Sequence, residues 1–128
     1  MFKANVLISE GNIPPERIRK FAICEVDAQD YLVRILEKPT EAIDASARED
    51  TLISVNCWRF PPAIFEACRR TPVSQRGEFE LPDAVEKAIN DLGVRFRVVR
   101  CSDGVLDLSS RNDVATVEQK LSSITVDP

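Results

Sequence analysis

Residues 35–41 read ILEKPTE, and they place an acid and a base side by side where an apolar run ends. Glu37 and Lys38 follow that run, and Pro39 closes it. Proline fixes its own φ and favours an extended residue before it, so both side chains would be aimed reproducibly. Two interpretations are open at this point: a solvated strand end, or a clamp for a charged and polar substrate.

The absence of histidine limits what chemistry the chain can perform. It excludes the Ser–His and Cys–His arrangements of nucleophilic catalysis. Any reaction must therefore use carboxylates, lysine, a metal ion or the positioning of substrates. A zinc site would need all four cysteines to converge, although they are far apart and have apolar neighbours, so we expect buried, reduced thiols instead. These cysteines are Cys24, Cys57, Cys68 and Cys101.

The composition is that of a globular domain, with 44% hydrophobic and 30% charged residues in a chain of 128. The formal net charge is −4 and the arginines are scattered, which argues against nucleic-acid binding. No apolar stretch approaches the roughly 18 residues of a membrane span, and the first residues do not resemble a signal peptide. We expect a cytoplasmic protein that binds neither nucleic acid nor membrane.

The elements that must position these residues alternate between β-rich and helical patterns. Asp27 and Asp30 flank a short connection that predicts a hairpin. Pro82 near the start and Gly93 at the end mark the clearest helix. We predict strands over 21–26, 31–37, 51–60, 94–99 and 105–108, and helices over 62–70, 81–92 and from 110 onward.

This order predicts an α/β fold with a mixed β-sheet and flanking helices. The last helix is expected to turn Val114, Val117 and Leu121 inward. The 4 glycines are not grouped, so no phosphate-cradling loop is present. The chain has the pattern of the latter part of a larger unit.

Four stretches, in order, resemble the C-terminal half of the sugar-phosphate nucleotidyltransferases: FAICEVDAQDYLVRILEKP, SVNCWRFPPAIFEA, RGEFELPDAVEKAI and GVLDLSSRNDV. These enzymes join a nucleoside triphosphate and a sugar 1-phosphate into an NDP-sugar and pyrophosphate. The resemblance runs from about Phe21 to Leu121. It implies that residues 1–128 are a single partial domain, the C-terminal half of an incomplete nucleotide-diphospho-sugar transferase (Rossmann-like) domain.

The resemblance assigns roles to the residues of the first stretch. It implies that Lys38 binds the sugar 1-phosphate and that Glu37 accepts hydrogen bonds from sugar hydroxyls, which suits a compact cation and a carboxylate. Asn56 would line the sugar pocket, although it could instead cap a strand edge. Ala22 stands where many members have a glycine that approaches the sugar, so its methyl group would alter the pocket.

The resemblance also implies a Mg²⁺ cofactor. Asp107 matches the family's second metal-binding aspartate, which suits a magnesium ion held by one or two carboxylates and by substrate phosphate oxygens. The alternative is a turn aspartate near Gly104. Glu78 and Asp83, in the third stretch, are interpreted as mainly structural. We expect Glu37, Lys38 and Asp107 to meet in one cleft.

The glycine-rich nucleotide loop and the first metal aspartate of the family have no counterpart in this sequence. The chain is therefore expected to be the sugar-phosphate-binding half of a nucleotidyltransferase, inactive on its own. An alternative is a non-catalytic sugar-phosphate-binding or regulatory module that pairs with a partner chain; another is a generic α/β domain. An unpaired sheet edge and exposed apolar surface would favour self-association, so either a homo-oligomer or a marginally stable chain is expected.

Overall fold

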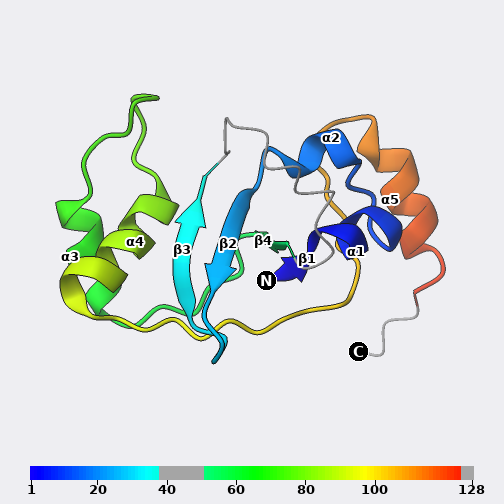
Figure 1. Ribbon diagram of the computed structural model, residues 1–128. Helices are drawn as coiled ribbons and strands as arrows, with labels where there is room; N and C mark the ends of the chain where they lie inside the picture. The colour runs from blue at the N-terminus through cyan, green and yellow to red at the C-terminus, as the bar shows by residue number, and fades with distance from the viewer. Residues whose placement is uncertain (38–50, 125–128) are drawn as a thin grey trace.

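The computed structural model describes residues 1–37 and 51–124. Within these ranges the chain forms, in order, β1 (Phe2–Lys3), α1 (Ala4–Ser9), α2 (Pro15–Ile18), β2 (Ala22–Val26), β3 (Leu32–Leu36), β4 (Leu52–Ser54), α3 (Ala63–Arg70), α4 (Leu81–Leu92) and α5 (Asp113–Leu121). A four-stranded sheet has helices on either side (Figure 1), which confirms the predicted α/β class.

The sheet has the strand order β1-β4-β2-β3. Each neighbouring pair of these strands is antiparallel. Among the residues that the structure describes, a parallel pairing occurs as the isolated bridge between Phe2 and Cys101. In Figure 1, β3 and α4 lie on one side of β2, whereas α1, α2 and α5 lie on the other side.

The hairpin predicted from the two aspartates joins β2 to β3. The Asp27 carboxylate accepts hydrogen bonds from the backbone N–H groups of Gln29 and Tyr31, both at 2.9 Å. Asp30 has a φ of 62°, a left-handed conformation that aspartate tolerates better than most residues. The register pairs Cys24 with Ile35 and Ile23 with Leu36. Leu36 is the last residue of β3, so Glu37 lies directly after the strand.

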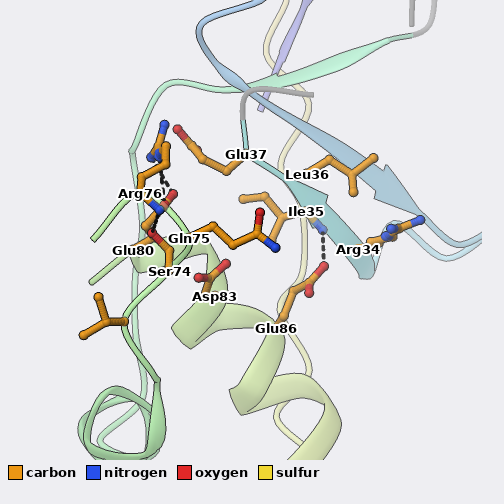
Figure 2. A pocket seen from close by; sticks show the side chains of 11 residues that line it. Arg34, Ile35, Leu36, Glu37, Ser74, Gln75, Arg76, Glu80, Asp83 and Glu86 are labelled. Atoms are coloured by element: carbon orange, nitrogen blue, oxygen red, sulfur yellow. Dashed lines mark hydrogen bonds and ion pairs between the residues drawn. The ribbon is translucent and has the colours of Figure 1, made fainter. Parts of the chain in front are cut away.

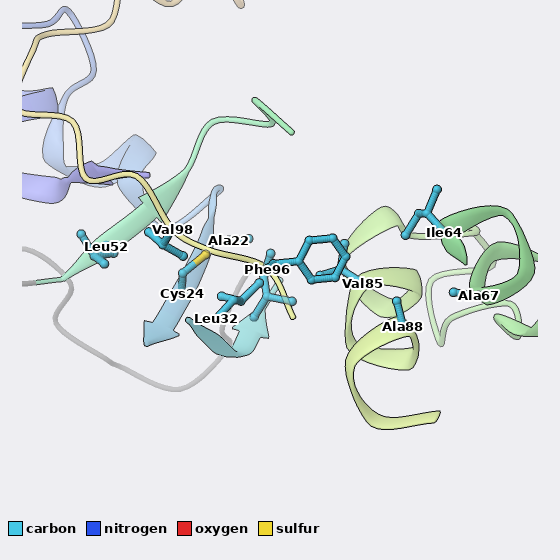
Figure 3. Close-up of a cluster of buried hydrophobic side chains, with 11 residues drawn as sticks. Ala22, Cys24, Leu32, Leu52, Ile64, Ala67, Val85, Ala88, Phe96 and Val98 are labelled. Atoms are coloured by element: carbon cyan, nitrogen blue, oxygen red, sulfur yellow. The ribbon is translucent and has the colours of Figure 1, made fainter. Parts of the chain in front are cut away.

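Successive side chains of the central strands enter two separate hydrophobic clusters, as alternation along a strand requires. Ala22 and Cys24 of β2 belong to the first cluster, against α3 and α4 (Figure 3), whereas Ile23 belongs to the second, with Ile13 and Ile18. In β4, Leu52 enters the first cluster and Ile53 the second. The sheet is therefore packed on both faces.

Helix α4 has the predicted ends. Pro82 lies in its first turn, and Gly93 terminates it in the left-handed conformation with a φ of 65°. Val85 and Ala88 are fully buried. Helices α3 and α4 pack against one another and extend the first cluster away from the sheet.

One predicted strand is shorter than expected, and two other predicted strands are not formed. The strand expected over 51–60 ends at Ser54, because Asn56 adopts a φ of 58° that no strand accommodates. The segment 94–99 shows the predicted alternation, with Phe96 and Val98 buried, but pairs with the chain near β3 only through the isolated Tyr31–Arg97 bridge and neighbouring hydrogen bonds. Residues 105–108 form no strand.

The orientation predicted for the last helix is wrong for two of its three residues. Val117 is partly buried, but Val114 and Leu121 are 49% and 50% exposed. Polar contacts of Asp113 and Lys120 help to join α5 to the rest of the chain. None of the described helices is long and apolar enough to cross a membrane.

Candidate functional site

A pocket of about 580 Å³ lies between the end of β3, the loop at residues 73–76 and the start of α4 (Figure 2). Residues 34–37 form one wall. The opposite wall carries Glu80, Asp83 and Glu86. We call this site the β3–α4 pocket. Its walls come from segments about forty residues apart in sequence, which the packing of α4 beside β3 brings together.

The β3–α4 pocket is rich in charge. Its acids are Glu37, Glu80, Asp83 and Glu86, and its bases are Arg34 and Arg76. Carboxylates accept hydrogen bonds, whereas guanidinium groups donate them and bind phosphate. Such a wall can contact both the hydroxyl groups and the phosphate of a small polar ligand.

Arg76 is held at the pocket by a tight turn and by an ion pair. The turn is closed by a hydrogen bond from Gly77 N–H to the Ser74 carbonyl at 2.9 Å, and Gly77 supplies the φ of 79°. Glu80 accepts from Nε and Nη2 of Arg76 at 3.0 and 2.6 Å, which raises the pKa of Arg76. This bidentate pair fixes the guanidinium plane and does not use Nη1.

The acids of α4 differ in their surroundings. Burial and, secondly, the charge of Glu80 raise the pKa of Asp83, while Arg76 opposes that shift. Glu86 accepts a hydrogen bond from the backbone N–H of Ile35 at 3.3 Å and so joins α4 to β3. The start of α4 thus forms a polar wall in which Asp83 is influenced by Glu80 and Arg76, and Glu86 contacts β3.

The predicted substrate residues are placed differently from one another. Glu37 lines the β3–α4 pocket. Its negative charge makes a small contribution to the raised pKa of Arg76, after that of Glu80. Lys38 lies outside the described residues. Asn56 is exposed at the end of β4, where its N–H donates to the Ser54 hydroxyl at 3.4 Å, and Ala22 is buried in the first hydrophobic cluster. The roles of all four residues stay predictions.

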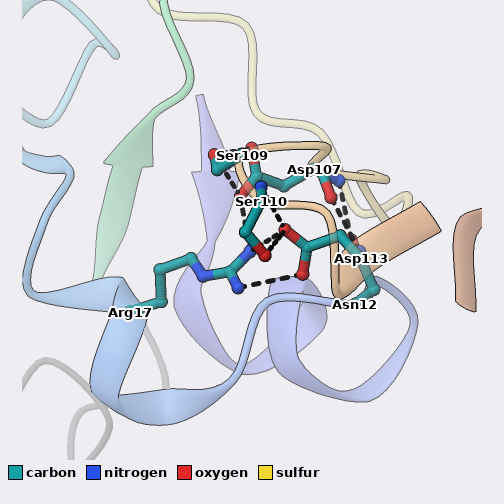
Figure 4. A network of polar contacts seen from close by, with 6 residues as sticks. All are labelled: Asn12, Arg17, Asp107, Ser109, Ser110 and Asp113. Carbon is teal, nitrogen blue, oxygen red and sulfur yellow. Dashed lines mark hydrogen bonds and ion pairs between the residues drawn. The ribbon is translucent and has the colours of Figure 1, made fainter.

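Asp107 lies in a second polar site (Figure 4), which we call the Arg17 cluster; its members are Asn12, Arg17, Asp107, Ser109, Ser110 and Asp113. Nη1 of Arg17 donates to Oδ2 of Asp107 at 2.8 Å. Nη2 donates to Oδ1 of Asp113 at 2.9 Å, and Nη1 also reaches Oδ2 of Asp113 at 3.2 Å. Arg17, followed by Ser110, lowers the pKa of Asp113 to about 2.

The expected common cleft is not formed by the described residues. Glu37 lies on the β3 side of the sheet, whereas Asp107 is held by α2 and by the start of α5 on the other side (Figure 1). The reason is that residues 104–113 pack against the connection between α1 and α2 instead of returning to the end of β3.

The donors around Asp107 do not fit a magnesium ion in this arrangement. Both of its carboxylate oxygens accept from the Ser109 hydroxyl, at 2.7 and 2.8 Å, and Oδ2 also accepts from Arg17. Magnesium prefers several oxygen ligands at about 2.0–2.1 Å, whereas Oδ2 of Asp107 is already hydrogen-bonded to the Arg17 guanidinium. Among the described residues, no group of three or more acidic, histidine or cysteine side chains could hold a metal ion. The metal role of Asp107 stays a prediction.

The cysteines were predicted to be buried, which is wrong for two of them. Cys24 is buried, and burial raises the pKa of its thiol to about 12. Cys57 and Cys68 are exposed, and Cys101 is partly exposed. All four are free thiols, and the described residues hold no cysteine group that could bind zinc.

Sequence reasoning missed two arginines. Arg76 stands at the start of RGEFELPDAVEKAI, a stretch already matched to the family, so its position there was a usable signal. Arg17 lies shortly after Pro14 and Pro15, in a segment for which no strand or helix was predicted. Its partners, Asp107 and Asp113, are 90 and 96 residues away in the sequence, so no local pattern could predict the contact.

Several curated proteins are similar to this chain, among them these three. A UTP–glucose-1-phosphate uridylyltransferase, AglF of Haloferax volcanii, is 27% identical over 106 residues, which are 83% of this chain and 41% of that enzyme. A low-salt glycan biosynthesis nucleotidyltransferase, Agl11 of the same organism, is 30% identical over 90 residues, or 70% of this chain and 22% of that protein.

The bifunctional protein GlmU of Methanocaldococcus jannaschii is 28% identical over 94 residues, which are 73% of this chain and 21% of that protein. This chain thus spans well under half the length of each of these relatives. No family model matches it.

Proposed function

The chain is related to the sugar-phosphate nucleotidyltransferases, and from this premise we propose that it is the sugar-phosphate-binding half of such an enzyme. The complete enzyme would form an NDP-sugar and pyrophosphate from a nucleoside triphosphate and a sugar 1-phosphate. This chain would have no such activity alone, because its sequence has no glycine-rich loop to position a triphosphate.

The observation that carries the proposal is the β3–α4 pocket. It brings Glu37, selected from the EKP motif, beside Arg76 from the RGEFELPD stretch. Two of the four family-like stretches therefore contribute to one cavity, although they are separated by the whole of β4 and α3.

In this proposal the pocket binds and orients a sugar 1-phosphate. Nη1 of Arg76 and the amine of Lys38, the residue after Glu37, would donate to the phosphate. Glu37 would accept from sugar hydroxyls. In the complete enzyme a phosphate oxygen of the sugar phosphate would attack the α-phosphorus of the nucleotide and displace pyrophosphate. That oxygen is already an anion, so no general base is needed, in keeping with the absence of histidine.

Calorimetry with glucose 1-phosphate tests the proposal. The wild type should bind, and Lys38→Ala and Arg76→Ala should each weaken binding at least about tenfold, the effect of one lost charge-assisted hydrogen bond. Arg100→Ala is the matched control, because Arg100 pairs with Asp30 outside the pocket and is similarly exposed. The proposal fails if glucose 1-phosphate and a panel of other sugar 1-phosphates give no heat, or if the control loses as much affinity.

A second candidate is the non-catalytic module that pairs with a partner chain. The observation that favours it is exposed apolar surface around α5: Leu108, Val114, Leu121 and Ile124 are 62%, 49%, 50% and 55% exposed. The DNA upstream of Met1 separates the two candidates. A continuous reading frame that encodes a glycine-rich loop would favour one long enzyme, whereas its absence would favour the module.

A further inference from the structure

The connection between α1 and α2 is fastened to the C-terminal part of the chain by close backbone packing. A Cβ added at Gly11 would lie 2.5 Å from the carbonyl oxygens of Leu7 and Val105. A Cβ added at Gly104 would lie 2.6 Å from the carbonyl oxygen of Glu10. The two glycines therefore allow residues 10–12 and 104–107 to approach more closely than other residue types permit.

Side chains add to this contact. The Asn12 amide makes two hydrogen bonds to the Asp107 backbone, accepting from its N–H at 2.6 Å and donating to its carbonyl at 2.8 Å. Lys120 of α5 donates to the carbonyls of Glu10 and Gly11 at 3.0 and 2.8 Å. The backbone of Asp107 is thus held in place independently of the contacts that its carboxylate makes.

The Arg17 guanidinium occupies the space between the two carboxylates of this site. The Asp113 side chain is 9% exposed, and those of Asp107 and Arg17 are 19% and 21% exposed. The Ser109 hydroxyl donates to Oδ1 of Asp107, and the Ser110 hydroxyl donates to Oδ2 of Asp113, which also accepts from Arg17. Two acids that share one partner can both stay ionised when a cation lies between them, and the chain itself supplies that cation in Arg17.

We propose that Arg17 is the resident cation of the Asp107–Asp113 site, in place of a metal ion, and that it joins α2 to the start of α5. Asp107 is then a structural residue of this chain. This inference is independent of whether the β3–α4 pocket binds sugar phosphate.

Metal binding is tested on the full chain with Mg²⁺ by calorimetry and with Mn²⁺ by electron paramagnetic resonance. The wild type should give no saturable binding at Asp107. Arg17→Met keeps the length of the side chain but removes its charge, so Mn²⁺ binding by this variant that Asp107→Asn removes would support the proposal. Saturable binding by the wild type that Asp107→Asn removes would overturn it.

Thermal unfolding tests the joining role without any metal. Arg17→Met should lower Tm by about 5–10 °C because two adjacent carboxylates lose their cation. Arg17→Lys should recover part of that loss. Arg100→Met, which breaks the single exposed pair with Asp30, is the control and should change Tm by about 2 °C at most. Equal losses in Arg17→Met and Arg100→Met would overturn the proposal, as would a wild-type Tm raised by Mg²⁺ more than by NaCl of the same ionic strength.

Discussion

The β3–α4 pocket and the Arg17 cluster contain the same residue types but arrange them differently. Each places an arginine among carboxylates where a loop leads into a helix. In the Arg17 cluster both carboxylates contact the guanidinium and serines donate to them as well. In the pocket Arg76 also pairs directly with Glu80, but that pair and the other charged side chains line open space. Charge alone therefore does not mark a binding site; what matters is whether the groups face each other or a cavity.

The largest expected effect comes from the core beneath the Arg17 cluster. Ile53 is fully buried in the second hydrophobic cluster, so Ile53→Ala should lower the free energy of unfolding by about 3–4 kcal/mol. Val85→Ala, in the first cluster behind the pocket, should cost about 2 kcal/mol. Urea unfolding followed by circular dichroism measures both. A smaller loss for Ile53→Ala than for Val85→Ala would contradict this order, which follows from the larger side chain that isoleucine loses.

A methyl group at two glycines should distinguish close packing from open space. Gly11→Ala should cost about 2 kcal/mol because its Cβ meets two backbone oxygens. Gly77→Ala has space but a φ of 79°, so it should cost about 1 kcal/mol and also disturb the turn that holds Arg76. Urea unfolding gives the two costs, and calorimetry with glucose 1-phosphate should register a change for Gly77→Ala alone. Equal affinity in wild type and Gly77→Ala would argue against a role for that turn in binding.

The decrease in the free energy of unfolding at acidic pH should depend on the ionisation of Asp113. Its pKa is lowered from 3.8 to about 2, so it contributes stability above pH 4 that is lost as the pH falls through 2. Asp113→Asn should be less stable than wild type at pH 7 and should lose less stability between pH 4 and pH 2. Midpoints of urea unfolding at each pH measure this. Parallel profiles for the two proteins would contradict the ion pair with Arg17.

Asp83 should behave in the opposite sense and by less. Its pKa is raised, so the charged carboxylate costs stability as the pH rises through that value. Asp83→Asn should therefore be as stable as wild type at pH 7, or slightly more stable. The same urea measurements at pH 4 and pH 7 check it. A clear loss of stability at pH 7 would mean that the pocket holds this charge as favourably as the Arg17 cluster holds Asp113.

Local signals predicted the local parts of the fold. Asp27 and Asp30 correctly predicted the hairpin, and Pro82 and Gly93 correctly predicted the two ends of α4. Each of these residues affects the backbone conformation only within a few residues of itself. The 94–99 segment has the alternation of a strand but not its pairing, since a strand exists only where another segment offers a continuous edge.

The candidate site was predicted in part for the same reason. Glu37 could be selected from the motif that contains it, but nothing near Asp107 indicates that its partner is Arg17, 90 residues earlier. Arg17 and Asp107 meet because Gly11 and Gly104 let two backbone segments touch, a condition that no single stretch of sequence contains.

The chain has one tryptophan, and its surroundings make it an intrinsic optical label. Trp58 stacks on Phe60 with ring centroids 5.5 Å apart, and each of these rings makes a T-shaped contact with Phe96, at centroid distances of 6.1 and 6.0 Å. Indole emission should therefore shift to longer wavelength when the 94–98 segment detaches and exposes Trp58 to water. Near-ultraviolet dichroism of the same aromatic trio would follow that step without any dye.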